Sequence, residues 1–155
     1  MDFQITGLKR AQFAHLIGLS DAELAGHNAR RVVADRQPGF PCRVSLVDAQ
    51  PGESLLLMNF EHLPLASPYR ASHAIYVREN ASDARLAINE IPPVLRTRLL
   101  SLRAYSEDGM LLDADVAEGA QLVPLIGRML AEEAVAFLHV HNARPGCYAA
   151  RIERA

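Results

Sequence analysis

The amino-acid sequence predicts an α+β fold: a mainly antiparallel sheet with two or three helices packed on one side or end. The chain of 155 residues is long enough to bury one sizeable core. Many short segments alternate apolar and polar residues as strands do, whereas few segments keep a helical spacing. We therefore expect a single domain over residues 1–155, whose sheet could be strongly curled.

The first elements of the chain are a short strand and a short helix. Phe3 and Ile5 alternate with polar residues, which predicts an opening strand. Ser20 and Glu23 have the spacing of a capping box, in which each side chain accepts from the other residue's backbone N–H. The helix that begins there is expected to end at Gly26 in a left-handed conformation.

Four strands are expected in the next part of the chain, over residues 31–35, 42–47, 54–62 and 73–78. The segment Gln50-Pro-Gly-Glu53 has the pattern of a type II turn, and it predicts a hairpin between the second and third of these strands. The third strand is apolar on both alternating faces, so we expect it to be central and covered on each side.

A hairpin is predicted over residues 99–116, with its turn at Glu107-Asp-Gly109. A two-residue loop would place Leu102 opposite Asp115 and mix polar and apolar groups on each face. A three-residue loop with a left-handed Gly109 separates them, so we predict that register. It pairs Leu100, Leu102 and Ala104 with Val116, Ala114 and Leu112, and Arg103 with Asp113.

The main helix is expected over residues 121–133, where apolar residues recur at helical spacing. Pro124 fits its first turn, in which the backbone amides have no helical partners. Two strands, residues 135–142 and 148–154, end the chain.

Composition and charge argue against several classes of protein. The net charge of −2 and the mixed distribution of charge exclude the basic stripe typical of nucleic-acid binding. No apolar run reaches membrane-spanning length, and the segment after Met1 lacks the basic and apolar regions of a signal peptide. With only two cysteines, far apart in the sequence, we expect reduced thiols and a cytoplasmic location.

Seven segments of the chain carry a resemblance to a known family: residues 38–43, 52–57, 68–72, 75–79, 102–105, 139–142 and 146–148. Within them stand the motifs Pro-Gly-Phe-Pro-Cys-Arg, Pro-Tyr-Arg-Ala-Ser and His-Val-His-Asn. Nearly the whole chain thereby resembles a bacterial family catalogued as domain of unknown function 1203. The resemblance implies one domain of about this length, and it implies no activity and no site residues.

A metal site is one candidate for the chemistry of the chain. His139 and His141 alternate on a predicted strand, so their imidazoles project from one face about 6.6 Å apart along the backbone. Zinc sites usually need at least three protein ligands. Further ligands could come from a set without motif spacing: His62, His73, Cys42, Cys147 and Glu133. Histidines that are half-buried and hydrogen-bonded to backbone or water are the commoner case, and we favour that alternative.

A reactive thiol is a second candidate. Cys42 and Cys147 each stand at the start of a predicted strand, where a side chain can be exposed. A nucleophilic thiolate would need a histidine or arginine beside it. Small buried cysteines are common in protein cores, so a structural role is the favoured alternative for both.

The third candidate is a pocket for a small polar or anionic ligand. Arginine forks and a tyrosine hydroxyl at the mouth of a loop can hold a carboxylate or phosphate. The candidate ligand-binding residues are Cys42, Arg43, Tyr69, Arg70, His73, Arg78, Asn142 and Cys147. The alternative, which we favour for Arg70 and Arg78, is ion pairing with local acids such as Glu79 and Asp83.

A last hypothesis is a homodimer, formed through a sheet edge or through an apolar face. Leu99, Tyr105 and Leu111 stand on the more polar face of the 99–116 hairpin and could pair with a second copy. The sequence is thus compatible with three functions. We favour binding of a small polar or anionic ligand over a metal- or thiol-dependent enzyme of unspecified cofactor and over a homo-oligomeric interaction module.

Overall fold

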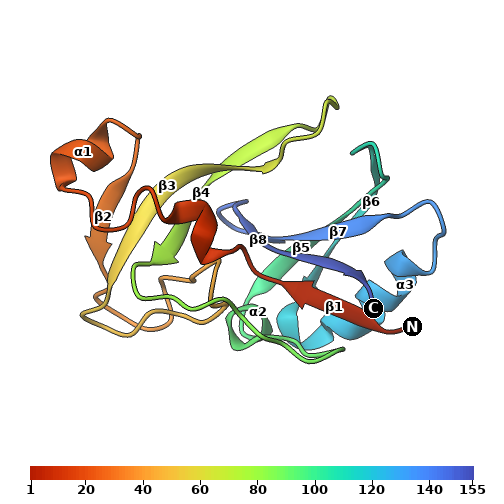
Figure 1. Ribbon diagram of the computed structural model, residues 1–155. Coiled ribbons are helices and arrows are strands. Elements are labelled where there is room, and N and C mark those ends of the chain that lie inside the picture. The colour runs from red at the N-terminus through yellow and green to blue at the C-terminus, as the bar shows by residue number, and fades with distance from the viewer.

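The structure is a computed structural model that describes residues 1–155, and its strands form two antiparallel sheets (Figure 1). The five-stranded sheet has, in spatial order, β1 (Phe3–Thr6), β8 (Tyr148–Arg154), β7 (Phe137–Asn142), β5 (Leu99–Tyr105) and β6 (Leu111–Glu118). The three-stranded sheet has β2 (Arg30–Val33), β3 (Ser54–Leu63) and β4 (Ala71–Arg78). The predicted α+β class is confirmed, but the strands form two sheets, and neither is strongly curled.

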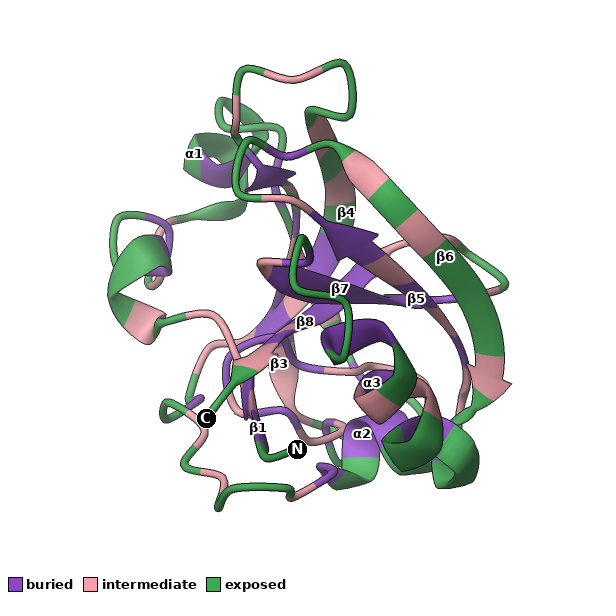
Figure 2. Cartoon of the chain, turned by 90° about the vertical axis from the view of Figure 1, so that its right-hand side faces the viewer, coloured by how far each residue is buried: buried purple, intermediate pink, exposed green.

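Helix α3 (Leu122–Leu130) covers one face of the five-stranded sheet together with the short α2 (Pro93–Arg96) (Figures 1 and 2). The buried side of α3 contributes Ile126 and Met129 to the main core. The helix predicted over residues 121–133 is confirmed, although it ends earlier. Its end is fixed by Arg154 of β8, whose guanidinium donates to the carbonyl of Leu130 at 2.7 Å. No helix of the protein is long and apolar enough to span a membrane.

The three-stranded sheet packs on a second core with α1 (Asp21–Ala25) and a 3₁₀ turn (Arg10–Phe13). The predicted capping box of α1 is confirmed, because Ser20 Oγ accepts from Glu23 N and Ser20 N donates to Glu23 Oε2. The left-handed stop at Gly26 is wrong, since Gly26 has a right-handed φ of −62°. The chain reverses two residues later, at Asn28, whose φ is 53°.

The predicted strand over residues 42–47 is wrong. This segment is a compact turn held by isolated bridges, Pro41 with Asp48 and Cys42 with Tyr76. Leu46 adopts a φ of 54°, which reverses the chain and cannot continue a strand. The partners of β3 are therefore β2 and β4, and β3 is central, as predicted. The type II turn is confirmed, since Gly52 has a φ of 90°.

The predicted register of the β5–β6 hairpin is also wrong. Leu102 lies opposite Asp115, the pairing that the apolar pattern disfavoured, because Leu112 forms a bulge next to the turn. The left-handed Gly109 is confirmed, with a φ of 82°. Figure 2 shows the physical reason: β6 is an edge strand with mostly exposed or half-exposed side chains. Matching its apolar residues to β5 would therefore bury little additional area.

Candidate functional site

Four histidines meet where the two sheets face each other. His139 and His141 alternate on β7 and project from the face of the five-stranded sheet that lies opposite α3. His62 near the end of β3 and His73 on β4 come from the other sheet. The pattern of alternation predicted that His139 and His141 share a face. His62 and His73, two of the further ligands considered from the sequence, do approach them in the structure.

The imidazoles are joined by short contacts. His62 Nε2 lies 2.9 Å from His73 Nδ1, and His62 Nδ1 lies 3.2 Å from His139 Nδ1. The ring of His62 also stacks on Tyr148, with centroids 5.0 Å apart. His141 Nδ1 lies 2.9 Å from the carbonyl oxygen of Gly146 and must donate to it, because a carbonyl can only accept. His141 Nε2 consequently carries a lone pair, and this buried atom has no hydrogen-bond partner.

Burial keeps the cluster uncharged near neutral pH. Desolvation lowers the pKa of His62 to about 4, that of His141 to about 3 and that of His139 to about 2. The pKa of His73 is lowered for the same reason. The charged neighbours that add to these shifts are other histidines and arginines, Arg103 among them, and none is a carboxylate. The imidazole lone pairs therefore remain available as ligands.

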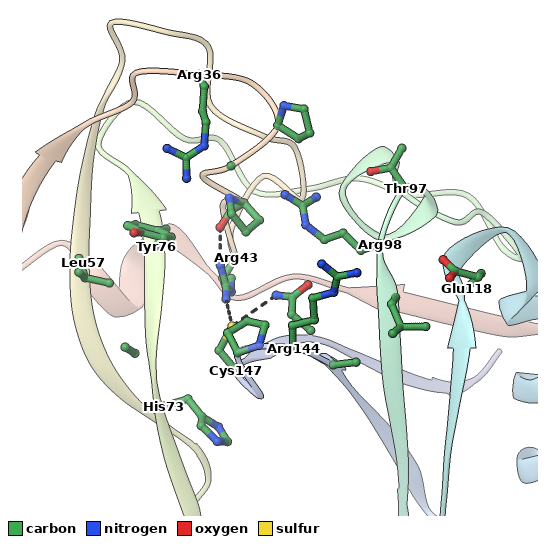
Figure 3. Close-up of a pocket in the computed structure, with 18 residues that line it drawn as sticks. Arg36, Arg43, Leu57, His73, Tyr76, Thr97, Arg98, Glu118, Arg144 and Cys147 are labelled. Carbon is green, nitrogen blue, oxygen red and sulfur yellow. Dashed lines mark hydrogen bonds between the residues drawn. The ribbon is translucent and has the colours of Figure 1, made fainter.

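A cavity of about 940 Å³ opens beside the cluster, between β4 on one side and the start of β5 on the other (Figure 3). His73 is the histidine that lines it. Four arginines also line the cavity: Arg36, Arg43, Arg98 and Arg144. Glu118 is the one acid among the lining residues, and Arg36 and Arg98 pair with Asp35 and Asp48 outside the lining set. Arg43 and Arg144 therefore give the cavity wall its excess of positive charge. Such a surface attracts anions.

Arg43 forms the most buried part of the cavity wall, with a relative exposure of 2 %. Its Nε donates to the carbonyl of Tyr148 at 2.7 Å, and its Nη1 donates to the carbonyl of Pro41 at 2.6 Å. Its Nη2 lies 3.0 Å from Cys147 Sγ. Burial lowers the pKa of Arg43, but arginine begins from so high a value that the guanidinium stays charged. This buried cation has no carboxylate among its hydrogen-bond partners.

Cys147 lines the cavity and receives a second donor. Asn142 Nδ2 lies 3.4 Å from Cys147 Sγ, the same sulfur that Arg43 Nη2 approaches. Cys147 is partly exposed, whereas Cys42 is fully buried, and both thiols are free. The Oδ1 atom of Asn142 is buried and has no hydrogen-bond partner. The wall thus presents a guanidinium, an amide and a thiol at one place.

A comparison with protein families finds a match over most of the chain. Residues 39–154 match the family described as protein of unknown function DUF1203. The chain belongs to this family. The resemblance noted in the sequence is thereby confirmed, and the matched residues include the four histidines, Arg43 and Cys147. No curated protein and no solved structure matches the chain significantly.

The eight residues expected to bind a ligand do not all meet in this DUF1203 protein. Those that line the cavity are Arg43, His73, Asn142 and Cys147. Cys42 lies in the core, where its Sγ accepts from the backbone of Arg78 at 3.3 Å. Tyr69 stands at the tip of the β3–β4 hairpin, near Tyr105.

Arg70 and Arg78 are occupied by ion pairs away from the cavity. Arg70 pairs with Glu61 at 3.0 Å, and Arg78 pairs with Glu53. Ion pairing was the favoured alternative for both arginines, but the acids named for it were wrong. Glu79 instead pairs with Arg31 at 2.9 Å. The pairing of β3 with β4 brings Glu61 and Glu53 beside Arg70 and Arg78, and the sequence did not reveal these partners because it predicted no such pairing.

Three arginines of the cavity were missed by sequence reasoning. Arg36 and Arg144 stand on loops at its rim, and Arg98 follows α2. Arg144 lies in the Pro- and Gly-containing stretch after His141, and turn residues beside a charged group were the available signal. Nothing comparable marks Arg98, whose bidentate partner Asp48 is 50 residues away.

The apolar face considered for a homodimer is partly covered within one chain. Tyr105 is buried, and its ring stacks on Phe137 with centroids 5.5 Å apart. Leu63 of the other sheet completes this small core. Leu99 lines the cavity instead of a free surface. Leu99 and Leu111 are half-buried, so the three side chains do not form one fully exposed patch, and the homodimer stays a prediction.

Proposed function

We propose that this DUF1203 protein binds a small anionic molecule, a carboxylate or a phosphate, in the cavity between the two sheets. The observation that carries the proposal is Arg43, a buried guanidinium in the cavity wall without a carboxylate partner. Buried charges are normally paired, because removing a charge from water is costly. A bound anion would supply the missing negative charge.

The unused hydrogen-bonding capacity of Arg43 supports this proposal. A guanidinium carries five N–H donors, and Arg43 uses three of them, on Tyr148, Pro41 and Cys147. The remaining donors lie at a wall of the cavity. Arg144, exposed at the rim, adds positive charge that would steer an anion inward, whereas Arg36 at the rim pairs with Asp35 at 3.0 Å.

A thiol-dependent reaction is the second candidate, and Cys147 favours it. Its Sγ lies within hydrogen-bond distance of both Arg43 and Asn142. An arginine beside a partly exposed cysteine is typical of reactive thiols. An anionic ligand held by Arg43 would lie beside this sulfur.

A thermal-shift titration with inorganic phosphate and with succinate tests anion binding. A ligand that binds only the folded state raises the stability by about 2.7 kcal/mol at one hundred times its dissociation constant. For a chain of this length that corresponds to a rise in Tm of roughly 5 to 10 °C. We expect at least one of the two anions to produce it.

Two variants and one control test whether the anion binds in the cavity. Arg144→Ser removes an exposed rim charge and should weaken the binding about three- to five-fold, since an exposed ion pair contributes up to about 1 kcal/mol. Arg43→Lys keeps the charge but loses the fork, and it should weaken the binding further. The matched control is Arg70→Ser, which removes an exposed arginine outside the cavity. Equal shifts in all the variants, or no shift with either anion, would contradict the proposal.

Thiol labelling gives an independent prediction. Iodoacetamide should alkylate Cys147 and leave Cys42 unmodified in the folded protein, because only Cys147 is accessible from the cavity. Peptide mass spectrometry reads out both sites. An anion that raises Tm should slow the labelling several-fold, and Cys147→Ser should abolish it, whereas Cys42→Ala should not. Equal labelling of the two cysteines would show that the cavity gives no selective access.

A further inference from the structure

Beyond anion binding, the histidine cluster has the geometry of a metal centre. We infer that His62, His73 and His141 bind one divalent transition-metal ion, such as zinc, at the edge of the cavity. One nitrogen of each imidazole lies within 4.8 Å of a nitrogen of both other rings. The three residues come from three different strands of two sheets, so the site is fixed by the way the sheets pack.

The separations fit tetrahedral coordination after a small adjustment. Two nitrogens at about 2.0–2.1 Å from a tetrahedral zinc ion are about 3.3 Å apart. His62 Nε2 and His73 Nδ1 are 2.9 Å apart, and the widest separation in the set is bounded by 4.8 Å. An ion would therefore require movements of a few tenths of an ångström to about an ångström, which rotations of the imidazole side chains can supply.

The hydrogen bonds of His141 prepare it to act as a ligand. A metal-binding histidine usually donates its remote ring N–H to a carbonyl or carboxylate, and this fixes the tautomer. His141 Nδ1 donates to Gly146 O, so Nε2 has a lone pair directed away from that bond. His141 is completely buried, and its Nε2 has no partner. A buried acceptor without a partner is uncommon, and a bound cation would satisfy it.

His62 has a similar second contact. When its Nε2 faces the ion, its Nδ1 carries the proton and can donate to His139 Nδ1 at 3.2 Å. His139 thus orients a ligand and does not itself coordinate. The pair predicted from the sequence, His139 with His141, is therefore replaced by three ligands drawn from both sheets.

The charges around the cluster favour an anionic fourth ligand. Three neutral imidazoles leave the double positive charge of the ion uncompensated, and Arg43 and Arg103 are the charged groups that act on His73. His73 lines the cavity, so a fourth ligand would enter from there. Three protein ligands with an open position are typical of catalytic zinc sites. A carboxylate or hydroxide would fill that position from the cavity side.

Titration of the chelator-treated, desalted protein tests the site. Zn²⁺ should bind with one ion per chain in isothermal titration calorimetry and raise Tm. Co²⁺ should give the intense visible absorption of tetrahedral coordination. His73→Ala removes the least buried ligand, so it is the variant with the least risk to folding, and it should weaken binding of both ions at least ten-fold.

His27→Ala is the matched control, because His27 is exposed and lies near His15, outside the cluster. It should bind both ions as the unaltered protein does. An absence of binding, or equal weakening in His73→Ala and His27→Ala, would overturn the metal site. The titration is done without added phosphate or carboxylate, and the anion titration is done on chelator-treated protein. A negative metal titration therefore does not contradict anion binding, and a negative anion titration does not contradict the metal site.

Discussion

Stripped of metal ions, the protein is expected to lose several kcal/mol of stability when the pH falls from about 8 to about 5. The cause is the burial of His62, His139 and His141, whose relative exposures are 8 %, 1 % and 0 %. In the unfolded chain these imidazoles titrate near pH 6.5, whereas desolvation in the folded protein lowers their pKa values to about 4, 2 and 3. Protons therefore bind preferentially to the unfolded state.

The sign and size follow from proton linkage. A group whose folded pKa is lowered below 6.5 costs nothing above that pH, and it favours unfolding as the pH falls toward the folded value. At about pH 5 each such histidine destabilises the fold by about 2 kcal/mol. Three of them together approach the roughly 5–15 kcal/mol total stability of an ordinary domain. We expect partial or complete unfolding near this pH.

Urea denaturation at a series of pH values measures the effect, with the free energy of unfolding plotted against pH. Below about pH 4 the slope should decrease, because His62 then takes up a proton in the folded state as well. His15→Gln is a matched control, since His15 is exposed and the variant should keep the same pH profile. A free energy of unfolding that is constant between about pH 8 and pH 5 would contradict the burial of neutral imidazoles.

The elements that the sequence predicted well are those that depend on nearby residues. The capping box of Ser20 and Glu23 and the turn at Gly52 are formed by residues at most three positions apart. The apolar stripe of α3 depends on a local period as well. The strand over residues 42–47 failed because its extended form required a neighbour, and β3 already had one on each side. Strand partners depend on the whole fold, so a local pattern cannot determine them.

The candidate site likewise combines features that depend on nearby residues with features that depend on the whole fold. Alternation along β7 placed His139 and His141 on one face, and this local inference was sound. The contact between Arg43 and Cys147 spans 104 residues, and that between His62 and His139 spans 77. No period or spacing encodes such contacts. The predicted register of the β5–β6 hairpin assumed that the apolar residues of the two strands must match. Because β6 is an edge strand, this match was not required, and the edge position is likewise a property of the assembled sheet.

The largest effect of a single substitution is expected for Gly119→Ala. Gly119 is buried between α2 and β6, and a β-carbon there would lie 1.9 Å from the carbonyl oxygen of Leu95. That oxygen belongs to the backbone of α2, so no side-chain rotation can relieve the overlap. The cost should reach or exceed the roughly 3 kcal/mol typical of severe overpacking.

The same substitution should disturb the cavity, because Gly119 joins two parts of its wall. Its backbone N–H donates to the carbonyl of Arg98 at 2.8 Å, and its neighbour Glu118 also lines the cavity. Displacing this junction should weaken anion binding in any variant that still folds.

Gly127→Ala is the matched control, since the same methyl group would meet nothing within 4 Å on α3. In a helix interior alanine is more stable than glycine by roughly 0.5–1 kcal/mol, so this variant should be stabilised. Urea denaturation of both variants measures the opposite signs. If Gly119→Ala were as stable as Gly127→Ala, the result would contradict the close approach of α2 to the end of β6. It would also contradict the wall of the cavity described at this junction.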